Sequence, residues 1–153
     1  PDYPESAAVV TVPFTRTPDG ALTGIKSTSY GESVVALRYA KNKGADEAIF
    51  LNSLNYLCEG STSNLFLIYD NEVVTPHLRS GCLPGTMRRR VIEVAKENDI
   101  EIVEMDVSPF GQELDFAFLT SSLRCLQPIH RIDESDLPIV HPLFERLKDC
   151  VDA

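Results

Sequence analysis

A lysine in a loop of small residues is the first side chain of this sequence whose setting could serve chemistry. Lys26 lies between Gly24 and Tyr30, among serine and threonine residues and directly ahead of a predicted helix. A partly buried lysine amine can lose its proton and form a Schiff base with a carbonyl compound. Most lysines instead lie solvated at the surface, and the loop by itself is compatible with that role as well.

A carboxylate occupies a second loop that could bind a ligand. Glu59 is followed by Gly60, by three hydroxyl residues and Asn64, and then by the apolar run 65–69. This order predicts a loop that leads into a buried strand, and a rigid strand end can offer an ionised acceptor to a bound molecule. An ordinary turn is the simpler interpretation, because Gly, Ser and Asn are common in turns.

Two further groups of residues could bind phosphate. The segment 83–87 runs into a helical pattern, and the free N–H groups of a first helical turn favour an anion. The hydroxyl residues 120–122 follow a short apolar strand and could complete the same site, or merely end the strand. An amine, a carboxylate and two groups of phosphate donors together suit pyridoxal 5'-phosphate, which has an aldehyde, a pyridine nitrogen and a phosphate.

The composition predicts a single globular domain that binds neither nucleic acid nor a membrane. The chain has 153 residues, of which 43% are hydrophobic and 24% are charged. Its net charge of -9 would repel nucleic acid, and no apolar run approaches the roughly 20 residues that cross a bilayer. The four cysteines lie far apart, so we expect reduced thiols, no metal site and a cytoplasmic location.

The elements that must position these groups alternate between strands and helices. Periodicity and turn residues predict helices over 33–43, 86–97 and 138–151, the first with Val34, Val35, Leu37 and Ala40 on one apolar face. The segment 109–114 could form one or two turns of helix. Strands are predicted over 7–14, 45–51, 65–69, 73–76, 101–107, 116–119 and 126–132, and Pro13 indicates that the first is an edge strand or ends there. Turn residues at 52–55 and 70–72 predict two hairpins, which favours an antiparallel sheet. The class is α/β, or α+β with interleaved elements, and the strand order stays open.

Six blocks of this sequence, in this order, resemble one enzyme family. They are the loop with Lys26 ahead of Tyr30, then 44–48, 59–66, 75–76, 83–88 and 118–122 ahead of Pro128. The family is the class IV, or fold type IV, pyridoxal-phosphate enzymes: branched-chain aminotransferases, D-amino acid aminotransferases and aminodeoxychorismate lyases. The resemblance covers about 25–133 and implies that 1–153 is the larger C-terminal, cofactor-binding domain, a mixed sheet or pseudo-barrel with flanking helices.

The resemblance implies roles for four residues around the cofactor ring. Lys26 matches the lysine that holds the cofactor as a Schiff base and moves the substrate proton. Glu59 matches the acid that pairs with the pyridine nitrogen. Tyr30 stands near the place of a tyrosine that contacts the Schiff base in some members, and Asn64 matches an asparagine that supports the cofactor loop.

Four more residues are implied for the phosphate and the substrate. Thr86 and Met87 match the helix start whose N–H groups bind phosphate, and Ser122 matches a phosphate-binding hydroxyl. Leu123 follows where a backbone N–H faces the substrate carboxylate. Many relatives carry the hydroxyl of this helix start one position later, so the resemblance supports backbone bonds from the turn rather than a side-chain bond.

The resemblance leaves three functions open. The first is an aminotransferase that uses Lys26 to move an amino group between an amino acid, branched-chain substrates being candidates, and a 2-oxo acid. The second is an aminodeoxychorismate lyase that releases pyruvate with the same lysine. The third is a non-catalytic binding domain, against which the intact Lys26 and Glu59 argue. The family's smaller N-terminal domain has no counterpart here, so we expect a longer polypeptide, a fragment that is inactive alone, and a homodimer.

Overall fold

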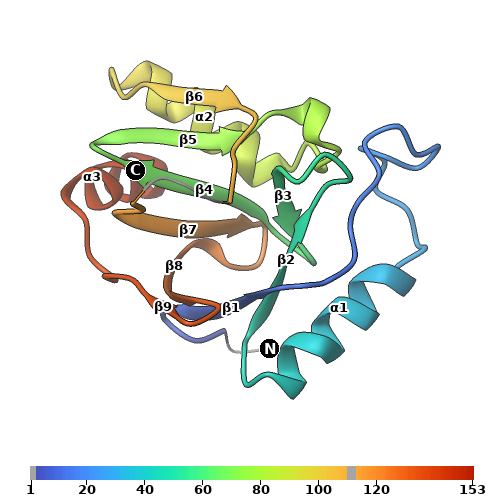
Figure 1. Cartoon of the computed structure of the whole chain (residues 1–153). Coiled ribbons are helices and arrows are strands. Elements are labelled where there is room, and N and C mark those ends of the chain that lie inside the picture. Colours follow the sequence, from blue (N-terminus) through green and yellow to red (C-terminus); the bar gives the residue numbers. More distant parts are fainter. Residues whose placement is uncertain (1–2, 110–112) are drawn as a thin grey trace.

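A curved, nine-stranded mixed sheet with helices on its flanks forms the protein (Figure 1). The computed structural model describes residues 3–109 and 113–153. The strands are β1 Ala7–Thr11, β2 Glu47–Leu51, β3 Leu57–Gly60, β4 Asn64–Tyr69, β5 Glu72–Pro76, β6 Ile102–Met105, β7 Phe116–Ser121, β8 Cys125–Ile132 and β9 Ser135–Asp136. The helices are α1 Gly31–Asn42, α2 Thr86–Glu97 and α3 Pro142–Asp152, with a short 3-10 helix, η1 Leu78–Ser80.

The strand order is β3-β2-β1-β8-β7-β4-β5-β6, with β9 beside β8. Strand β1 pairs in parallel with both β2 and β8, and β5 pairs in parallel with β6. The remaining pairs are antiparallel and include the two predicted hairpins, β2-β3 and β4-β5. The expected mixed sheet with flanking helices is therefore confirmed.

Strand β1 lies inside the sheet, so its assignment as a possible edge strand is wrong. The alternative, that the strand ends near Pro13, is correct: β1 stops at Thr11. Proline removes a ladder donor only if it lies within the paired region. Pro13 lies beyond the end of β1, and its position therefore does not indicate whether β1 is an edge strand.

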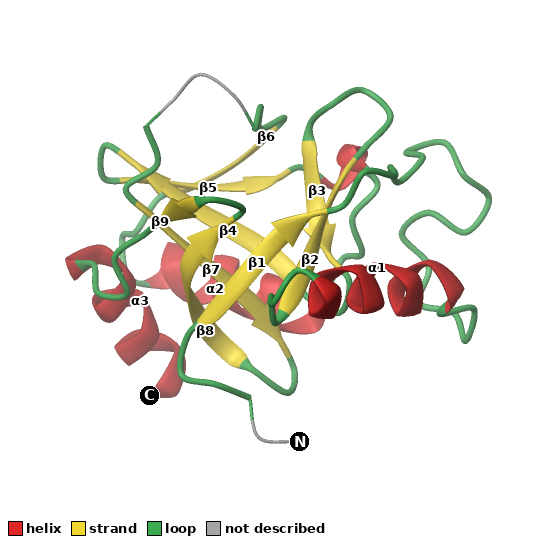
Figure 2. Cartoon of the chain, turned by 60° about the horizontal axis from the view of Figure 1, so that its bottom comes forward, coloured by secondary structure: helices red, strands yellow, loops and turns green. Residues whose placement is uncertain are grey.

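Both faces of the central strands are buried, which explains their continuous apolar sequences. Leu65 and Leu67 of β4 lie in a core with residues of β1, β2, β7 and β8. Phe66 and Ile68 point to the other face and pack beneath α2 and α3. The ring of Phe66 stacks on Phe118 of β7 with centroids 5.0 Å apart. Figure 2 shows α2 and α3 together on one side of the sheet and α1 beside β1 and β2.

Helix α1 buries only part of its predicted apolar face: Ala40 is buried as expected and Leu37 is half-buried, but the two valines are exposed. Val34 and Val35 are 61% and 56% exposed, whereas Ala36 and Ala40 are fully buried. Ala36 and Ala40 belong to the core cluster that also contains Ala48 and Phe50 of β2. Their small side chains allow close packing, and the two valines are left facing outward.

Most other boundaries agree with the sequence-based expectations to within a few residues. Helix α2 matches 86–97 as predicted, and the closing helix begins at Pro142 rather than at 138. The helical turns expected at 109–114 fall largely outside the described residues. Within the described part of the chain, none of the helices combines the length and apolarity that spanning a bilayer requires.

Candidate functional site

Glu59 lies in strand β3 and not in a loop as predicted, because residues 57–60 pair with β2. Its carboxylate is buried and binds the segment ahead of α2. Strand β3 pairs Glu59 with Phe50 of β2. Glu59 Oε2 accepts a hydrogen bond of 2.8 Å from the backbone N–H of Leu83, and Oε1 lies 3.5 Å from Arg16 Nε. Burial raises the pKa of Glu59, while the Leu83 N–H and Arg16 oppose that rise and Glu47 adds to it. The acid is thus desolvated and only partly compensated by positive charge.

Asn64, the first residue of β4, binds the same segment at the backbone carbonyl of Leu83. Its side-chain amide donates a 2.8 Å hydrogen bond to the carbonyl of Leu83. A Cβ atom at Gly85 would lie 2.2 Å from Asn64 Oδ1, so only glycine lets the backbone approach this closely. Both polar groups of Leu83 are therefore bound, one by Glu59 and one by Asn64, which fixes the start of α2 relative to the acid.

The two groups of predicted phosphate donors meet at the start of α2. Thr86 Oγ1 lies 3.1 Å from Ser122 Oγ, which follows β7. Gly85 is the N-cap, and no side chain of the described residues caps this helix. The N–H groups of Thr86 and Met87 belong to the first turn, where an α-helix has no internal acceptors and attracts anions. This hydroxyl pair beside an uncapped helix start can bind a phosphate group.

Lys26 lies in an exposed loop on the outside of the segment that Glu59 holds. A Cβ atom at Gly24 would be 4.0 Å from Pro84 Cδ, and one at Gly81 would be 3.4 Å from Thr23 Cγ2. The lysine loop therefore packs along residues 81–84. The Lys26 side chain itself is exposed.

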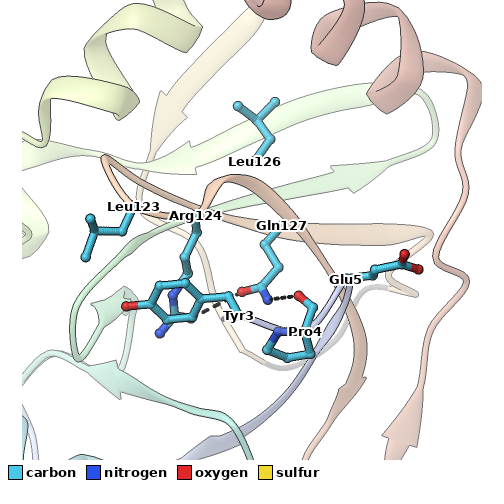
Figure 3. A pocket seen from close by; sticks show the side chains of 7 residues that line it. All are labelled: Tyr3, Pro4, Glu5, Leu123, Arg124, Leu126 and Gln127. Atoms are coloured by element: carbon cyan, nitrogen blue, oxygen red, sulfur yellow. Dashed lines mark hydrogen bonds between the residues drawn. The ribbon is translucent and has the colours of Figure 1, made fainter. Parts of the chain in front are cut away.

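Tyr30 and Leu123 are also exposed, by 47% and 72%. Tyr30 is the N-cap residue of α1 and ends the lysine loop. Leu123 borders a cavity of about 370 Å³ that Tyr3, Arg124 and Gln127 also line (Figure 3). Neither this cavity nor one of about 290 Å³ beside β1 is lined by Lys26 or Glu59. Contacts with residues 83–86 thus join Glu59, Asn64 and Ser122, whereas the side chains of Lys26, Tyr30 and Leu123 are exposed.

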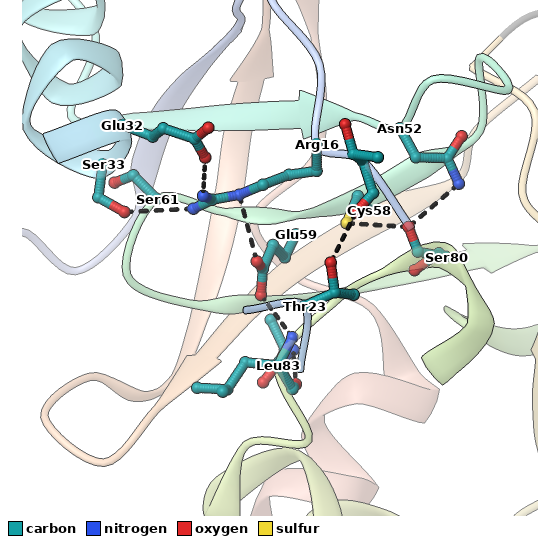
Figure 4. Close-up of polar contacts among 12 residues, drawn as sticks. Arg16, Thr23, Glu32, Ser33, Asn52, Cys58, Glu59, Ser61, Ser80 and Leu83 are labelled. Atoms are coloured by element: carbon teal, nitrogen blue, oxygen red, sulfur yellow. Dashed lines mark hydrogen bonds and ion pairs between the residues drawn. The ribbon is translucent and has the colours of Figure 1, made fainter. Parts of the chain in front are cut away.

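Arg16 is a functional candidate that sequence reasoning missed. It forms an ion pair with Glu32, donates a 3.2 Å hydrogen bond to Ser33 Oγ and lies near Glu59, as Figure 4 shows. Its guanidinium carbon lies 4.1 Å from the centre of the Phe50 ring. Arg16 precedes the lysine loop, and its two partners in α1, Glu32 and Ser33, follow the loop. The Arg16 side chain therefore connects the two ends of the loop and also contacts Glu59. No local pattern around Arg16 signals these contacts.

Glu47 is a second missed residue and organises the loop after Glu59. It is fully buried and accepts hydrogen bonds from the hydroxyls of Ser61, Thr62 and Ser63. Arg124 completes its surroundings with a 3.0 Å ion pair. The available signal was a glutamate within an otherwise apolar strand, since a buried carboxylate needs partners.

Comparisons with known proteins identify relatives of this chain. Residues 1–132 match the family described as amino-transferase class IV. The branched-chain-amino-acid aminotransferase of Pseudomonas aeruginosa is 34% identical over 74% of this chain and 37% of its own length. The chloroplastic branched-chain-amino-acid aminotransferase 5 of Arabidopsis thaliana is 32% identical over 81% of this chain and 31% of its own. The chain thus spans about a third of these relatives.

Solved structures show the same likeness. The Legionella pneumophila protein named "Putative 4-amino-4-deoxychorismate lyase" superposes with a TM-score of 0.92 at 28% identity, covering 96% of this chain and 55% of that one. The branched-chain aminotransferase of Thermobaculum terrenum, in its PLP form, gives 0.90 at 28% identity, with 96% and 50% covered. The enzyme of Escherichia coli gives 0.88 at 26% identity, with 95% and 51% covered.

Proposed function

We propose, from the premise that this chain belongs to the class IV aminotransferase family, that it provides the cofactor-binding part of an aminotransferase. Class IV aminotransferases depend on pyridoxal phosphate, and the reaction would move an amino group between an amino acid and a 2-oxo acid. Branched-chain amino acids are the proposed substrates because the relatives compared above carry that name. Lys26 is the proposed catalytic residue.

One observation carries the proposal: the acid and the phosphate donors are fixed to the same short segment. Glu59 and Asn64 bind the two polar groups of Leu83, and α2 begins three residues later. Pyridoxal phosphate has a basic nitrogen and a phosphate at opposite ends of a flat ring, so binding it requires an acid and anion donors at a fixed separation. The residues present fit this requirement in chemical type.

Each of these residues has a definable task. Bound pyridoxal phosphate supplies a ring that accepts the electrons released when the substrate loses a proton. Glu59 holds a proton on the ring nitrogen, and the resulting positive charge compensates the buried carboxylate, whose pKa is raised without a ligand. Thr86, Met87 and Ser122 orient the phosphate. Lys26 carries the substrate proton at Nζ, for which it must be covered from water.

A lyase reaction is the alternative that a specific observation favours. The Legionella protein superposes with the highest TM-score of the three structures named above, 0.92. The same residues would bind the same cofactor, and elimination of pyruvate would replace transfer of the amino group. The pocket around the substrate decides between the two reactions, and Leu123 is the proposed contribution of this chain to it.

We also propose that other parts of the complete polypeptide and a second copy enclose the site. Lys26, Tyr30 and Leu123 are exposed in the described chain, as are the apolar side chains of Ile25 and Val34. Large apolar groups beside polar functional groups are typical of covered surfaces. A cytoplasmic location stays a prediction, supported by four cysteines that all carry free thiols.

Covalent trapping tests the proposed function. The complete polypeptide is incubated with pyridoxal phosphate, reduced with borohydride and digested, and the modified peptide is identified by mass spectrometry. We expect the added mass on Lys26 in the wild type and in Lys41→Ala, a matched exposed-lysine control, but not in Lys26→Ala. Labelling of another lysine, or none, would contradict the assignment. Glutamate formation from leucine and 2-oxoglutarate, measured against pyruvate release from aminodeoxychorismate, then separates the two reactions.

A further inference from the structure

A buried ion pair connects two parts of the candidate site that are far apart in the sequence. Arg124 Nη2 lies 3.0 Å from Glu47 Oε2, and the two side chains are 4% and 0% exposed. A fully desolvated pair of this kind is costly unless further hydrogen bonds surround both charges. The neighbours of each partner therefore indicate what the pair holds in place.

The neighbours of Glu47 come mainly from the loop between Glu59 and Asn64. Glu47 Oε1 accepts from the N–H of Ala48 at 2.8 Å and of Ser61 at 3.2 Å, and the Ser61 hydroxyl also donates to it. Oε2 accepts from Thr62 Oγ1 at 3.0 Å and Ser63 Oγ at 3.2 Å. The loop is thus wrapped around one carboxylate, which sets the positions of Glu59 at its start and Asn64 at its end.

The neighbours of Arg124 fix the turn that connects β7 and β8. Its backbone N–H donates to Ser121 Oγ at 3.1 Å, and Nη1 donates to Gln127 Oε1 at 3.3 Å. Tyr3 covers the guanidinium, whose carbon lies 4.6 Å from the ring centre (Figure 3). The same turn carries Ser122, so Arg124 connects the turn that meets Thr86 to Glu47.

These contacts form a closed network around the candidate site. The turn with Ser122 meets the start of α2 at Thr86, and the segment before α2 is bound by Glu59 and Asn64. The loop between those two residues returns to Glu47 and, through the ion pair, to the turn with Ser122. We infer that Glu47 and Arg124 are a positioning pair that keeps the phosphate end and the pyridine end of the cofactor site at a fixed separation. The inference rests on the proposed function.

This closed network explains why an ion pair occupies this place rather than two apolar side chains. A carboxylate accepts several hydrogen bonds at once, and a guanidinium offers donors in a rigid fork. Together they orient a loop on one side and a turn on the other. Apolar residues of similar volume would fill the space without setting either orientation.

Affinity for pyridoxal phosphate relative to pyridoxal, which lacks the phosphate, tests the inference. The complete polypeptide is compared with Arg124→Met, Arg124→Lys and the double variant Glu47→Gln/Arg124→Met, and Arg89→Met serves as an exposed-arginine control, since its side chain is 73% exposed. We expect Arg124→Met to lower the preference for the phosphorylated form about tenfold and to accelerate amide exchange at both Ser61 and Leu83. Arg124→Lys, which keeps the charge but not the fork, should lose about threefold.

The outcomes separate the inference from the function on which it rests. If the wild type binds no pyridoxal phosphate, the proposed function fails. If the wild type binds it and Arg124→Met only lowers the melting temperature, with the preference unchanged, the pair is merely structural and the inference is wrong. If Arg124→Met does not fold, two other variants test the inference: Arg124→Lys and the double variant, which removes both buried charges. The same ratio of affinities for pyridoxal phosphate and pyridoxal is then measured in each. An unchanged ratio in either would overturn the inference.

Discussion

Replacing Gly85 with alanine should break the hydrogen bond that Asn64 makes to Leu83. The backbone at Gly85, with φ -62° and ψ 144°, is accessible to alanine, so the substitution causes no backbone strain. The new Cβ atom would lie 2.2 Å from Asn64 Oδ1, whereas ordinary contact begins at 3.4 Å. Asn64 must therefore retreat by about 1.2 Å, the difference between these distances, and its 2.8 Å bond to the Leu83 carbonyl is lost.

The effect of Gly85→Ala on the free energy of unfolding depends on the hydrogen bonds that Leu83 keeps. The Leu83 carbonyl is half-buried and still accepts a 2.8 Å hydrogen bond from the Gly85 N–H, so the loss is that of one net hydrogen bond, about 0.5–1.5 kcal/mol. The reduced entropy of the unfolded chain offsets about 0.4–1 kcal/mol of this cost for Gly→Ala. Asn64→Ala loses the same hydrogen bond but has no clash with the new methyl group. The double variant should therefore cost no more than Asn64→Ala alone, which gives a coupling energy of about 0.5–1.5 kcal/mol between the two positions.

Urea denaturation of the complete polypeptide measures this double-mutant cycle. Gly31→Ala is the matched control, because a Cβ there has no heavy atom within 4 Å; it should leave the free energy of unfolding unchanged or slightly increased. The single variants should also weaken cofactor binding, since the Asn64 bond fixes the start of α2. Additive costs, or Gly85→Ala as harmless as Gly31→Ala, would refute the reasoning.

Three further predictions concern buried groups. Because burial raises the pKa of Glu59 above 4.5, the folded state binds more protons than the unfolded state between 4.5 and that raised value. The free energy of unfolding of the ligand-free protein should fall as pH rises across this window, and Glu59→Gln should lack this dependence. Equal pH slopes in the wild type and the variant would contradict the prediction. Thr75→Val should cost about 1–3 kcal/mol, measured by urea denaturation, because the fully buried hydroxyl donates a 2.7 Å bond to a β4 carbonyl. Burial raises the pKa of the Cys58 and Cys82 thiols, so iodoacetamide should label exposed Cys125 first, and early labelling of the other two would count against their burial.

Local turn chemistry explains why both hairpins could be predicted. Asn55, Asp70 and Asn71 adopt positive φ angles of 63°, 48° and 63°, a conformation that asparagine and aspartate tolerate better than most residues. The boundaries of α2 follow in the same way from a glycine ahead of it and an apolar period within it. These features depend on neighbours in sequence and were therefore visible without the fold.

The face of a helix that is buried depends on what the helix meets. Val34 and Val35 are the more hydrophobic residues of α1, yet the sheet accepts the small Ala36 and Ala40. The interior position of β1 is a similar case, because strand order follows from how distant segments pair. Periodicity identifies an element and its apolar residues but not the partner that covers them.

The sequence alone determined the family and the types of the candidate residues, since the blocks that contain Lys26 and Glu59 are local and keep their order. Only the tertiary structure decided that Glu59 is held beside Arg16 and that Glu47 meets Arg124. The physical reason is that a buried charge needs a partner, but nothing in its own neighbourhood specifies which distant charge will supply it. That choice is made by the strand order of the folded sheet.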